Sequence, residues 1–181
     1  MDKPITDILS EIIARTPTTP DVRTRHTERL AQGRPTRDED PDTHFCVYFL
    51  PFNPGTGEVF LVHHRKANLW ISPGGHIDAG ETPLETLGRE AREELGLPYN
   101  PPRNEQPFLL TITEIRTPSH PCRRHYDIWY LICTDGDGFV VDPAEFYETR
   151  WVGLPEALEL VSDPNNCQAL AEVQRRFAPS G

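Results

Sequence analysis

The chain has 181 residues and a formal net charge of −10, from 18 basic and 28 acidic residues. Its length suffices for one domain with a hydrophobic core, and its acidic balance argues against non-specific binding to nucleic acid, which requires a basic surface. The longest apolar runs, 44–52 and 127–133, are strand-sized, and the N-terminus lacks the basic and apolar segments of a signal peptide. We therefore expect a soluble, cytoplasmic protein without nucleic-acid or membrane partners.

Residues 1–40 are predicted to form a helical extension and linker ahead of the main domain, 41–181. Apolar residues at helical spacing predict a helix over 7–14, and a second, polar helix is predicted over 22–32, before Gly33. The segment 34–43 is charged and contains proline, as linkers do. We expect a docking arm without catalytic residues, with a contact between two copies in a homodimer as the alternative.

From residue 44 the pattern alternates between strands and helices. Strands are predicted over 45–50, 59–63, 108–115, 126–133 and 148–152, and closing helices over 155–161 and 165–177. Between them, Pro73, Gly74 and Gly75 predict a glycine-rich turn ahead of a strong helix. Mixed strands flanked by helices predict a layered α/β or α+β domain.

The four cysteines form no CxxC pair, which favours reduced thiols in the core; they are Cys46, Cys122, Cys133 and Cys167. His120, Cys122 and His125 have a spacing that superficially fits metal ligands. A zinc site needs further soft ligands nearby, and the neighbouring sequence offers none, so zinc is disfavoured there.

A helix over 83–95 has clear start and stop signals. Thr82 can cap it, Pro83 fits its first position, and Glu85 completes a capping box. Gly96 is suited to the left-handed residue that ends a helix. At about 100° per residue, one apolar face is expected to pack on the sheet; it comprises Leu84, Leu87, Gly88, Ala91 and Leu95.

Three carboxylates gather on a different face of this helix, at Glu90, Glu93 and Glu94. Like charges at this spacing destabilise an isolated helix by about 0.2–0.5 kcal/mol per pair. A bound cation reverses that effect, and hard oxygen ligands suit Mg²⁺ or Mn²⁺. The alternative is a solvated acidic face paired with Arg89 and Arg92.

The segment from Gly75 to Leu97 reads GHIDAGETPLETLGREAREELGL and resembles a complete Nudix box. Every fixed position is filled, with Ala91 as the first variable aliphatic residue. The order of strands and helices from residue 44 to about 177 is also similar to that family, whereas residues 1–40 fall outside the resemblance. The resemblance implies a Nudix-type α/β/α sandwich with a mixed β-sheet.

The resemblance also implies an enzyme that hydrolyses a nucleoside diphosphate linked to another group, with Mg²⁺ as cofactor and Mn²⁺ as a substitute. Glu90 and Glu94 would be direct metal ligands, joined by Glu93, directly or through water, and by the Gly75 carbonyl. Arg89 would orient the glutamates through Glu81, which makes both residues structural supports of the site.

The catalytic base stays open at this point. In the family it is a glutamate of the box, here Glu90, Glu93 or Glu94, or one in a distant loop. The distant candidate is Glu145, with Glu148 and Asp142 as rivals. The alternative is an ordinary acidic loop before a strand.

Two further segments are candidates for substrate contacts. Arg65, in a basic run after a strand, could meet phosphate oxygens, and Trp70 could stack on a base. His125 and Asp127 share a strand face with Trp129, opposite Tyr126, and one of the two faces is expected to be core. A structural histidine–aspartate pair is the alternative.

The motif does not select a substrate, and a nucleotide or nucleotide-sugar diphosphate is the broad expectation. The intact box favours catalysis over a catalytically silent nucleotide-binding or sensor module. An acidic scaffold without tight metal binding, and an isomerase on the same architecture, are the remaining alternatives.

Overall fold

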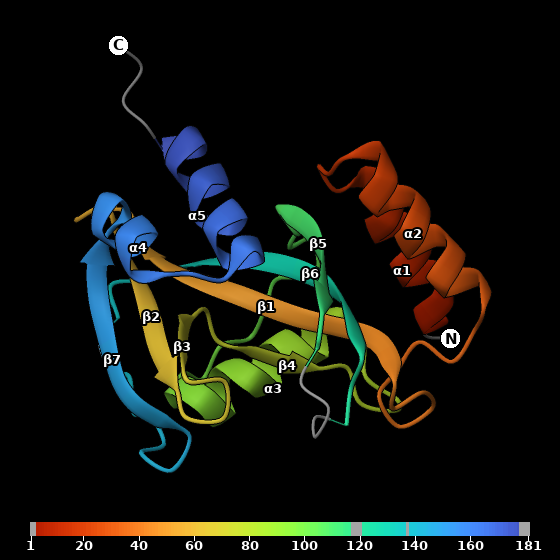
Figure 1. Ribbon diagram of the computed structural model, residues 1–181, viewed down its shortest axis with the longest axis horizontal. Helices are drawn as coiled ribbons and strands as arrows, with labels where there is room; N and C mark the ends of the chain where they lie inside the picture. The colour runs from red at the N-terminus through yellow and green to blue at the C-terminus, as the bar shows by residue number, and fades with distance from the viewer. Residues whose placement is uncertain (1–2, 117–120, 137, 178–181) are drawn as a thin grey trace.

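The computed structural model describes residues 3–116, 121–136 and 138–177. In this part of the chain, seven strands form one mixed sheet, and helices cover both of its faces (Figure 1). The layered arrangement confirms the predicted α/β/α sandwich with an N-terminal helical extension.

The main path through the sheet runs β3, β2, β1, β6, β5, while β4 pairs with β1 and β7 pairs with β2. Only β1 and β6 are parallel among these pairs. The strands are β1 (Thr43–Asn53), β2 (Glu58–His64), β3 (Leu69–Ile71), β4 (Gly74–His76), β5 (Leu109–Glu114), β6 (Arg124–Cys133) and β7 (Phe146–Gly153).

Strand β1 changes its antiparallel partner along its length. Near its start it pairs with β4, with Cys46 opposite His76 and Tyr48 opposite Gly74. At its far end it pairs with β2, where Phe52 lies opposite Val59. Along its other side β1 follows β6 throughout. This change of partner brings β4 beside the middle of the sheet.

The alternation of β1 builds two cores on opposite faces of the sheet. Its odd-numbered residues, such as Phe45 and Val47, pack with helix α3 (Pro83–Leu95) and helix α1 (Ile5–Arg15). Its even-numbered residues Leu50 and Phe52 pack with the layer of helices α4 (Leu154–Leu160) and α5 (Pro164–Phe177). Fully burying one such side chain contributes about 1.5–3 kcal/mol.

Helix α3 follows the sequence prediction closely. The Thr82 hydroxyl accepts from the Glu85 amide, the Glu85 side chain accepts from the Thr82 amide, and Gly96 is left-handed with φ of 63°. Leu87, Ala91 and Leu95 are fully buried in the core. The apolar face predicted for this helix is therefore confirmed, with Leu84 partly buried against the same core.

The N-terminal segment packs on the domain through α1 and α2 (Pro20–Ala31). Leu9 and Ile13 of α1 belong to the same core as α3. In α2, Arg29 is only 1% exposed. Its guanidinium donates to the carbonyls of Gly33, Arg34 and Thr43. These bonds hold the charged segment that follows α2, and the boundary predicted at residue 41 stays a prediction.

Three details differ from the sequence predictions. The segment predicted to be a glycine-rich turn forms the strand β4, and the sequence does not predict β3. Glycine has little intrinsic strand preference, so only its pairing with β1 reveals β4. A Cβ on Gly74 would overlap the Val47 carbonyl, so glycine is required at this close approach. Cys133 is exposed and is not a core thiol.

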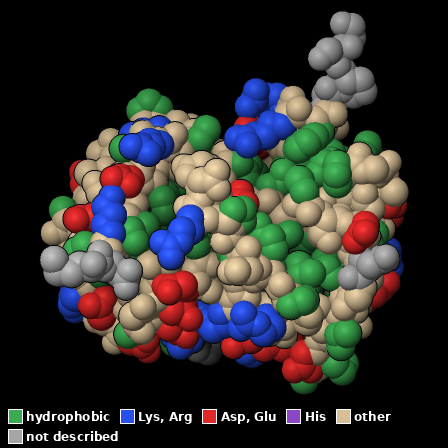
Figure 2. All heavy atoms as spheres, turned by 180° about the vertical axis from the view of Figure 1, so that it is seen from behind, with side chains coloured by type: hydrophobic (Ala, Val, Ile, Leu, Met, Phe, Trp, Pro, Cys, Tyr) green, Lys and Arg blue, Asp and Glu red, His purple; other side chains and the backbone are tan. Residues whose placement is uncertain are grey.

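Charged and apolar side chains are mixed on the face of the molecule that Figure 2 shows. Figure 2 shows acidic and basic side chains next to one another between apolar areas on the face opposite to that of Figure 1. Among the described residues, no helix combines the length and apolar character needed to cross a membrane.

Candidate functional site

Two glutamates of α3 converge on the backbone of β4. The Gly74 amide donates to Glu94 Oε2 at 2.8 Å. At Gly75, an added Cβ would overlap the carboxylate of Glu90, so only glycine leaves room for this carboxylate. Glu90 and Glu94 are 9% and 6% exposed. Burial chiefly, and then neighbouring carboxylates, raise the pKa of Glu94, and burial likewise raises the pKa of Glu90.

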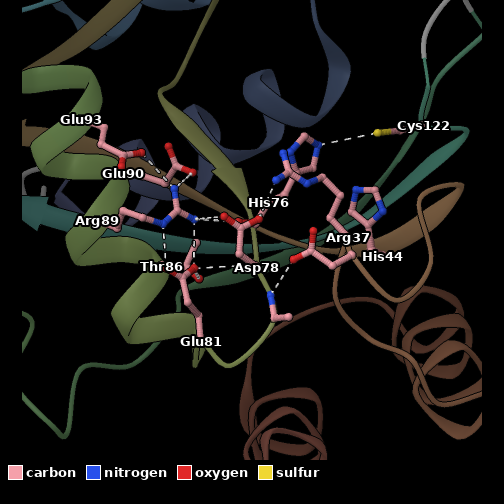
Figure 3. A network of polar contacts seen from close by, with 12 residues as sticks. Arg37, His44, His76, Asp78, Glu81, Thr86, Arg89, Glu90, Glu93 and Cys122 are labelled. Atoms are coloured by element: carbon pink, nitrogen blue, oxygen red, sulfur yellow. Dashed lines mark hydrogen bonds and ion pairs between the residues drawn. The ribbon is translucent and has the colours of Figure 1, made fainter.

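Arg89 lies at the centre of a polar network that holds these groups (Figure 3). It donates to both oxygens of Glu81 at 2.7 and 2.9 Å and to Glu90 Oε1 at 2.7 Å. A further bond of 3.0 Å reaches the His76 carbonyl on β4. The bonds to Glu81 chiefly raise the pKa of Arg89. One guanidinium therefore connects the start of α3, its acidic face and β4.

Glu93 differs from its two neighbours in exposure. Its side chain is 58% exposed and accepts a bond of 3.0 Å from Arg89 Nη1. Helical spacing predicts one acidic face for all three glutamates, but of the three only Glu93 is at the surface. Glu90 and Glu94 are buried because β4 covers them, which helical periodicity does not show.

The donor set fits a hard divalent cation. Buried carboxylates that repel each other raise the free energy of the site unless they are protonated or neutralised by a cation. Oxygen ligands of this kind are preferred by Mg²⁺ and Mn²⁺. Glu90 approaches the backbone at Gly75, where no side chain stands in the way, and Glu94 approaches it at the Gly74 amide. Glu90, Glu94 and the exposed Glu93 are the residues that could hold the ion.

A cleft of about 900 Å³ opens beside these glutamates. Glu90 and Glu94 line it together with Glu145, which lies in the turn immediately before β7. The charge of Glu145 is among the causes that raise the pKa of Glu94, after burial and the charge of Glu90. Basic side chains from other segments also reach the cleft: Arg37, His64, Lys66 and Arg116.

The two rivals of Glu145 are placed differently. Asp142 is exposed, and its side chain accepts from the Ala144 amide at 2.8 Å within the turn. Glu148 lies on β7, is exposed, and pairs with Arg150 at 2.7 Å. Of the three carboxylates, Glu145 alone is among the residues that line the cleft.

Arg65 and Trp70 make contacts within the protein. Arg65 Nε donates to the carbonyls of Pro143 and Phe146, at 2.9 and 3.1 Å. Its backbone amide donates to the Glu145 carbonyl. Arg65 thus holds the loop that carries Glu145. Trp70 stacks on the ring of His63, with centroids 5.2 Å apart. Substrate contacts by these two residues stay predictions.

Strand β6 is buried on both faces, which settles the question that its sequence left open. Tyr126, Ile128 and Tyr130 lie in the core with α3, while His125 and Trp129 line the cleft. Asp127 is fully buried. It accepts from the hydroxyls of Thr111 and Thr113, and burial raises its pKa to about 8.

Sequence reasoning missed several residues that line the cleft. These residues include Cys46 and Tyr48 on β1 and also His76, which lies on β4, far from β1 in the chain. His44 and Cys46 alternate on one strand, which gave a weak signal that both face the same side. His76 occupies a variable position of the motif. The histidine at position 120, part of the disfavoured zinc spacing, lies outside the described residues.

Comparison with known proteins agrees with this geometry. The family model of the NUDIX domain matches residues 42–173. The chain belongs to the NUDIX family. It is therefore a member of the Nudix hydrolase family, and two of the relatives described below are named as an RNA pyrophosphohydrolase and a bis(5'-nucleosyl)-tetraphosphatase.

Curated relatives of this Nudix hydrolase differ in their stated activities. An RNA pyrophosphohydrolase of Hahella chejuensis is 33% identical over 68% of this chain and 83% of its own length. The asymmetrical bis(5'-nucleosyl)-tetraphosphatase of Rattus norvegicus is 31% identical over 55% of this chain and 62% of its own. A putative ADP-ribose pyrophosphatase of Bacillus subtilis is 33% identical over 45% of this chain and 38% of its own. The chain spans less than two thirds of the length of most such relatives.

Solved structures show the same fold at low identity. The dihydroneopterin triphosphate pyrophosphohydrolase of E. coli has a TM-score of 0.56 at 19% identity, covering 71% of this chain and 92% of that chain. The Ap4A hydrolase of C. elegans, in a binary complex, has a TM-score of 0.53 at 17% identity, covering 74% and 98%. At this identity the likeness concerns the fold alone.

Proposed function

We propose that this Nudix hydrolase uses Mg²⁺ to cleave a diphosphate linkage in a small nucleotide-containing substrate. The observation that carries the proposal is the convergence of Glu90 and Glu94 on the glycine backbone of β4, inside a cleft. The intact motif and the names of the relatives support the reaction class. Mn²⁺ is the expected substitute.

The positions of the acidic residues support the roles that we assign to them. Glu90 and Glu94 would hold the ion together with the Gly75 carbonyl, and Glu93, at the solvent side, would bind it directly or through water. A bound Mg²⁺ would neutralise the negative charge of the phosphate groups and lower the pKa of a water bound to it. Arg89 keeps the carboxylates in place through Glu81, as a positioning residue.

Glu145 is the preferred general base. It lines the cleft beside Glu94, and Arg65 fixes its loop through two carbonyls. A carboxylate in this position can take the proton of the attacking water. A glutamate of α3 is the alternative base, because its carboxylates lie in the same cleft.

The basic residues of the cleft fit a phosphate-containing substrate. Arg37, Lys66 and Arg116 come from three different segments and reach the same space as the glutamates. Positive groups here can bind the phosphate oxygens that the acidic residues would otherwise repel. With an overall charge of −10, this local arrangement favours a small phosphate compound over a long nucleic acid.

A hydrolysis screen with Mg²⁺ and with Mn²⁺ tests the proposal. The substrates are nucleoside triphosphates, ADP-ribose, nucleotide sugars, dinucleoside polyphosphates, NADH and a 5′-triphosphate RNA oligonucleotide. Glu94→Gln is the inactive variant, and Glu85→Gln on the same helix is the matched control, because glutamine still completes a capping box. We expect turnover of one small-molecule class that only Glu94→Gln removes.

Two results would change this conclusion. Turnover that survives in Glu94→Gln would contradict the metal-ligand role of this residue. Binding of Mg²⁺ and of a nucleotide without turnover of any substrate would favour the nucleotide-binding or sensor module instead.

A further inference from the structure

Four potential metal ligands of the soft type lie together beside the acidic site. One nitrogen or sulfur atom from each of His44, Cys46, His76 and His125 lies within 4.8 Å of the others. Three of these residues are buried, and His76 is half-buried at the cleft. Imidazole nitrogen and thiolate sulfur are ligands that zinc prefers, in contrast to the oxygen donors of α3.

The register of the sheet explains how they meet. His44 and Cys46 are two positions apart on β1 and therefore share a face. On one side, His125 of β6 is the register partner of His44. On the other side, His76 of β4 is the register partner of Cys46. The backbone pairing of three strands thus fixes all four side chains on one face of the sheet.

The three imidazole rings are in mutual contact. Ring centroids are 4.8 Å apart for His44 and His76, 5.1 Å for His44 and His125, and 5.0 Å for His76 and His125. None of these three pairs is stacked, and the interplanar angles range from 38° to 81°. Rings at such angles can turn nitrogen atoms toward a common point.

The tautomer of His44 leaves a lone pair for a metal. Its Nδ1 lies 2.8 Å from the Asp40 carbonyl oxygen, which can only accept, so Nδ1 carries the proton. In the neutral ring, Nε2 then keeps its lone pair. This atom is buried and has no hydrogen-bond partner in the described part of the chain. Zinc-binding histidines are held in the same way, with the second ring nitrogen on a carbonyl or carboxylate.

From this geometry we propose that His44, Cys46, His76 and His125 bind a zinc-class divalent cation, at a site separate from the glutamates of α3. Four protein ligands are typical of a closed, structural zinc site. With bonds of about 2.0–2.3 Å, the ligand atoms of a tetrahedral site are about 3.3–3.8 Å apart. The cluster, at 4.8 Å, therefore has to contract by side-chain rotation when the ion binds.

Metal binding here displaces a proton from sulfur. Burial raises the pKa of Cys46, so the metal-free thiol is protonated at neutral pH. When the ion binds, the S–H bond breaks, the proton passes to solvent, and the thiolate electron pair binds the cation. The nearby positive charge of Arg37 is offset by its ion pair with Asp78, at 3.0 Å.

The expected consequence concerns β4. His76 would be a zinc ligand, while its carbonyl accepts from Arg89 and its neighbour Gly75 lies against Glu90. In Figure 3, His76 lies between the Arg89 network and Cys122. A cation held by the cluster would therefore fix the short strand on which the acidic site is built.

Cobalt substitution tests the proposal directly. The full chain is prepared under reducing conditions without chelator, its zinc content is measured by mass spectrometry, and Co²⁺ is then titrated into the metal-free protein. We expect one equivalent of a tightly held ion per chain. The Co²⁺ protein should show the intense visible bands of four-coordinate cobalt and a sulfur-to-metal charge-transfer band, which oxygen ligands do not give.

Variants separate this site from the acidic one. Cys46→Ala should remove the charge-transfer band, and His76→Gln should weaken Co²⁺ binding at least 10-fold while keeping that band. His76 is half-buried, so this second variant keeps the test informative if Cys46→Ala does not fold. The band should persist in Cys122→Ser, whose sulfur lies 3.7 Å from His76 Nε2 but outside the cluster. It should persist in Glu94→Gln as well.

Three results would overturn the proposal. The first is a wild-type protein that binds Co²⁺ without a charge-transfer band. The second is a band that survives in a folded Cys46→Ala variant or disappears in Cys122→Ser. The third is loss of the tightly held ion in Glu94→Gln, which would place the metal at the glutamates. Loss of the ion in Glu94→Gln would contradict the zinc site but not the proposed hydrolase activity. Failure of one proposal can therefore be distinguished from failure of the other.

Discussion

Two regions of this protein use the same short strand for different chemistry. On one face of β4, Gly75 lies against the buried carboxylate of Glu90 on α3. On the other, His76 joins the histidines and the cysteine of β1 and β6. Successive residues of a strand point to opposite faces. Gly75 therefore leaves room for a carboxylate on one face, while the adjacent His76 offers an imidazole nitrogen on the other.

The two regions also differ in how their side chains are held. The carboxylates come from one helix. The guanidinium of Arg89 pairs with Glu90 and Glu93 and offsets their repulsion, while Glu94 accepts from the Gly74 amide. The histidine and cysteine side chains come from three strands and are placed by backbone pairing. Removing one charged side chain should therefore disturb the geometry of the acidic region. Metal binding by the histidine and cysteine cluster should instead depend on which ligand atom, nitrogen or sulfur, each residue supplies.

The largest effect is expected for Glu94→Gln. Removing this charge should lower kcat by about 10²–10³-fold, the loss typical of removing one group that stabilises charge in the transition state. The fold should survive, because the glutamine oxygen can still accept from the Gly74 amide. Steady-state kinetics at saturating Mg²⁺, with circular dichroism as the check of folding, measure this. A kcat within a factor of two of the wild type would contradict the assignment.

Gly75→Ala should act through Glu90. The added methyl group would overlap the Glu90 carboxylate and move it from β4. A displacement of about 1 Å is enough to lower the rate about 10²-fold. The double variant Gly75→Ala, Glu90→Asp should recover part of this loss, because the shorter acid leaves room for the methyl group. Equal rates for the single and double variants would show that the overlap is not the cause.

Arg89→Lys should have a smaller effect of the same kind. Lysine keeps the charge but cannot bind Glu81, Glu90 and the His76 carbonyl at the same time. We expect a loss of about 10–100-fold in kcat or Mg²⁺ affinity, as for other residues that orient metal ligands. Titration with Mg²⁺ at a fixed substrate concentration distinguishes a lower kcat from a lower Mg²⁺ affinity. Unchanged values for both would remove Arg89 from the positioning role.

Asp127→Asn should leave turnover at pH 7 nearly unchanged and alter only the pH dependence of stability. Burial raises the pKa of Asp127 from 3.8 to about 8 in the folded protein. The contribution of the protonated acid is complete below pH 3.8 and is lost as the pH rises toward 8. The free energy of unfolding of the wild type should therefore fall over this range relative to that of the variant.

Urea unfolding of both proteins at pH 5 and pH 8.5 measures this difference. Parallel pH profiles for the two proteins would show that Asp127 is not protonated in the folded state. The isosteric asparagine keeps an oxygen for the hydroxyls of Thr111 and Thr113, so these bonds are matched.

The acidic region could be predicted because its signals are local. The capping box at Thr82, the terminal glycine at Gly96 and the spacing of the glutamates all lie within one segment, and the helix has the bounds that they predicted. The burial of Glu94 could not be predicted, because helical spacing gives the direction of a side chain but not what covers it. The covering strand, β4, consists mainly of glycine and exists only through its pairing with β1.

The histidine and cysteine cluster could not be predicted for a related reason. Its members are separated by as many as 81 positions between His44 and His125, and strand register alone brings them together. The local spacing around Cys122 pointed to only one of them, His125. A prediction of parallel pairing between β1 and β6 would have placed His44 beside His125, but parallel register has no local sequence signal.

The contact between His44 and Asp40 crosses the start of the segment that the family model matches. The family match starts at residue 42, two residues after Asp40. The Asp40 carboxylate pairs with the buried Arg29 at 3.4 Å, and its carbonyl fixes the ring of His44. A fragment cut at the homology boundary would keep all four histidine and cysteine ligands but lose the groups that orient the first of them. The groups that orient the proposed ligand His44 therefore lie outside the segment that the family model matches.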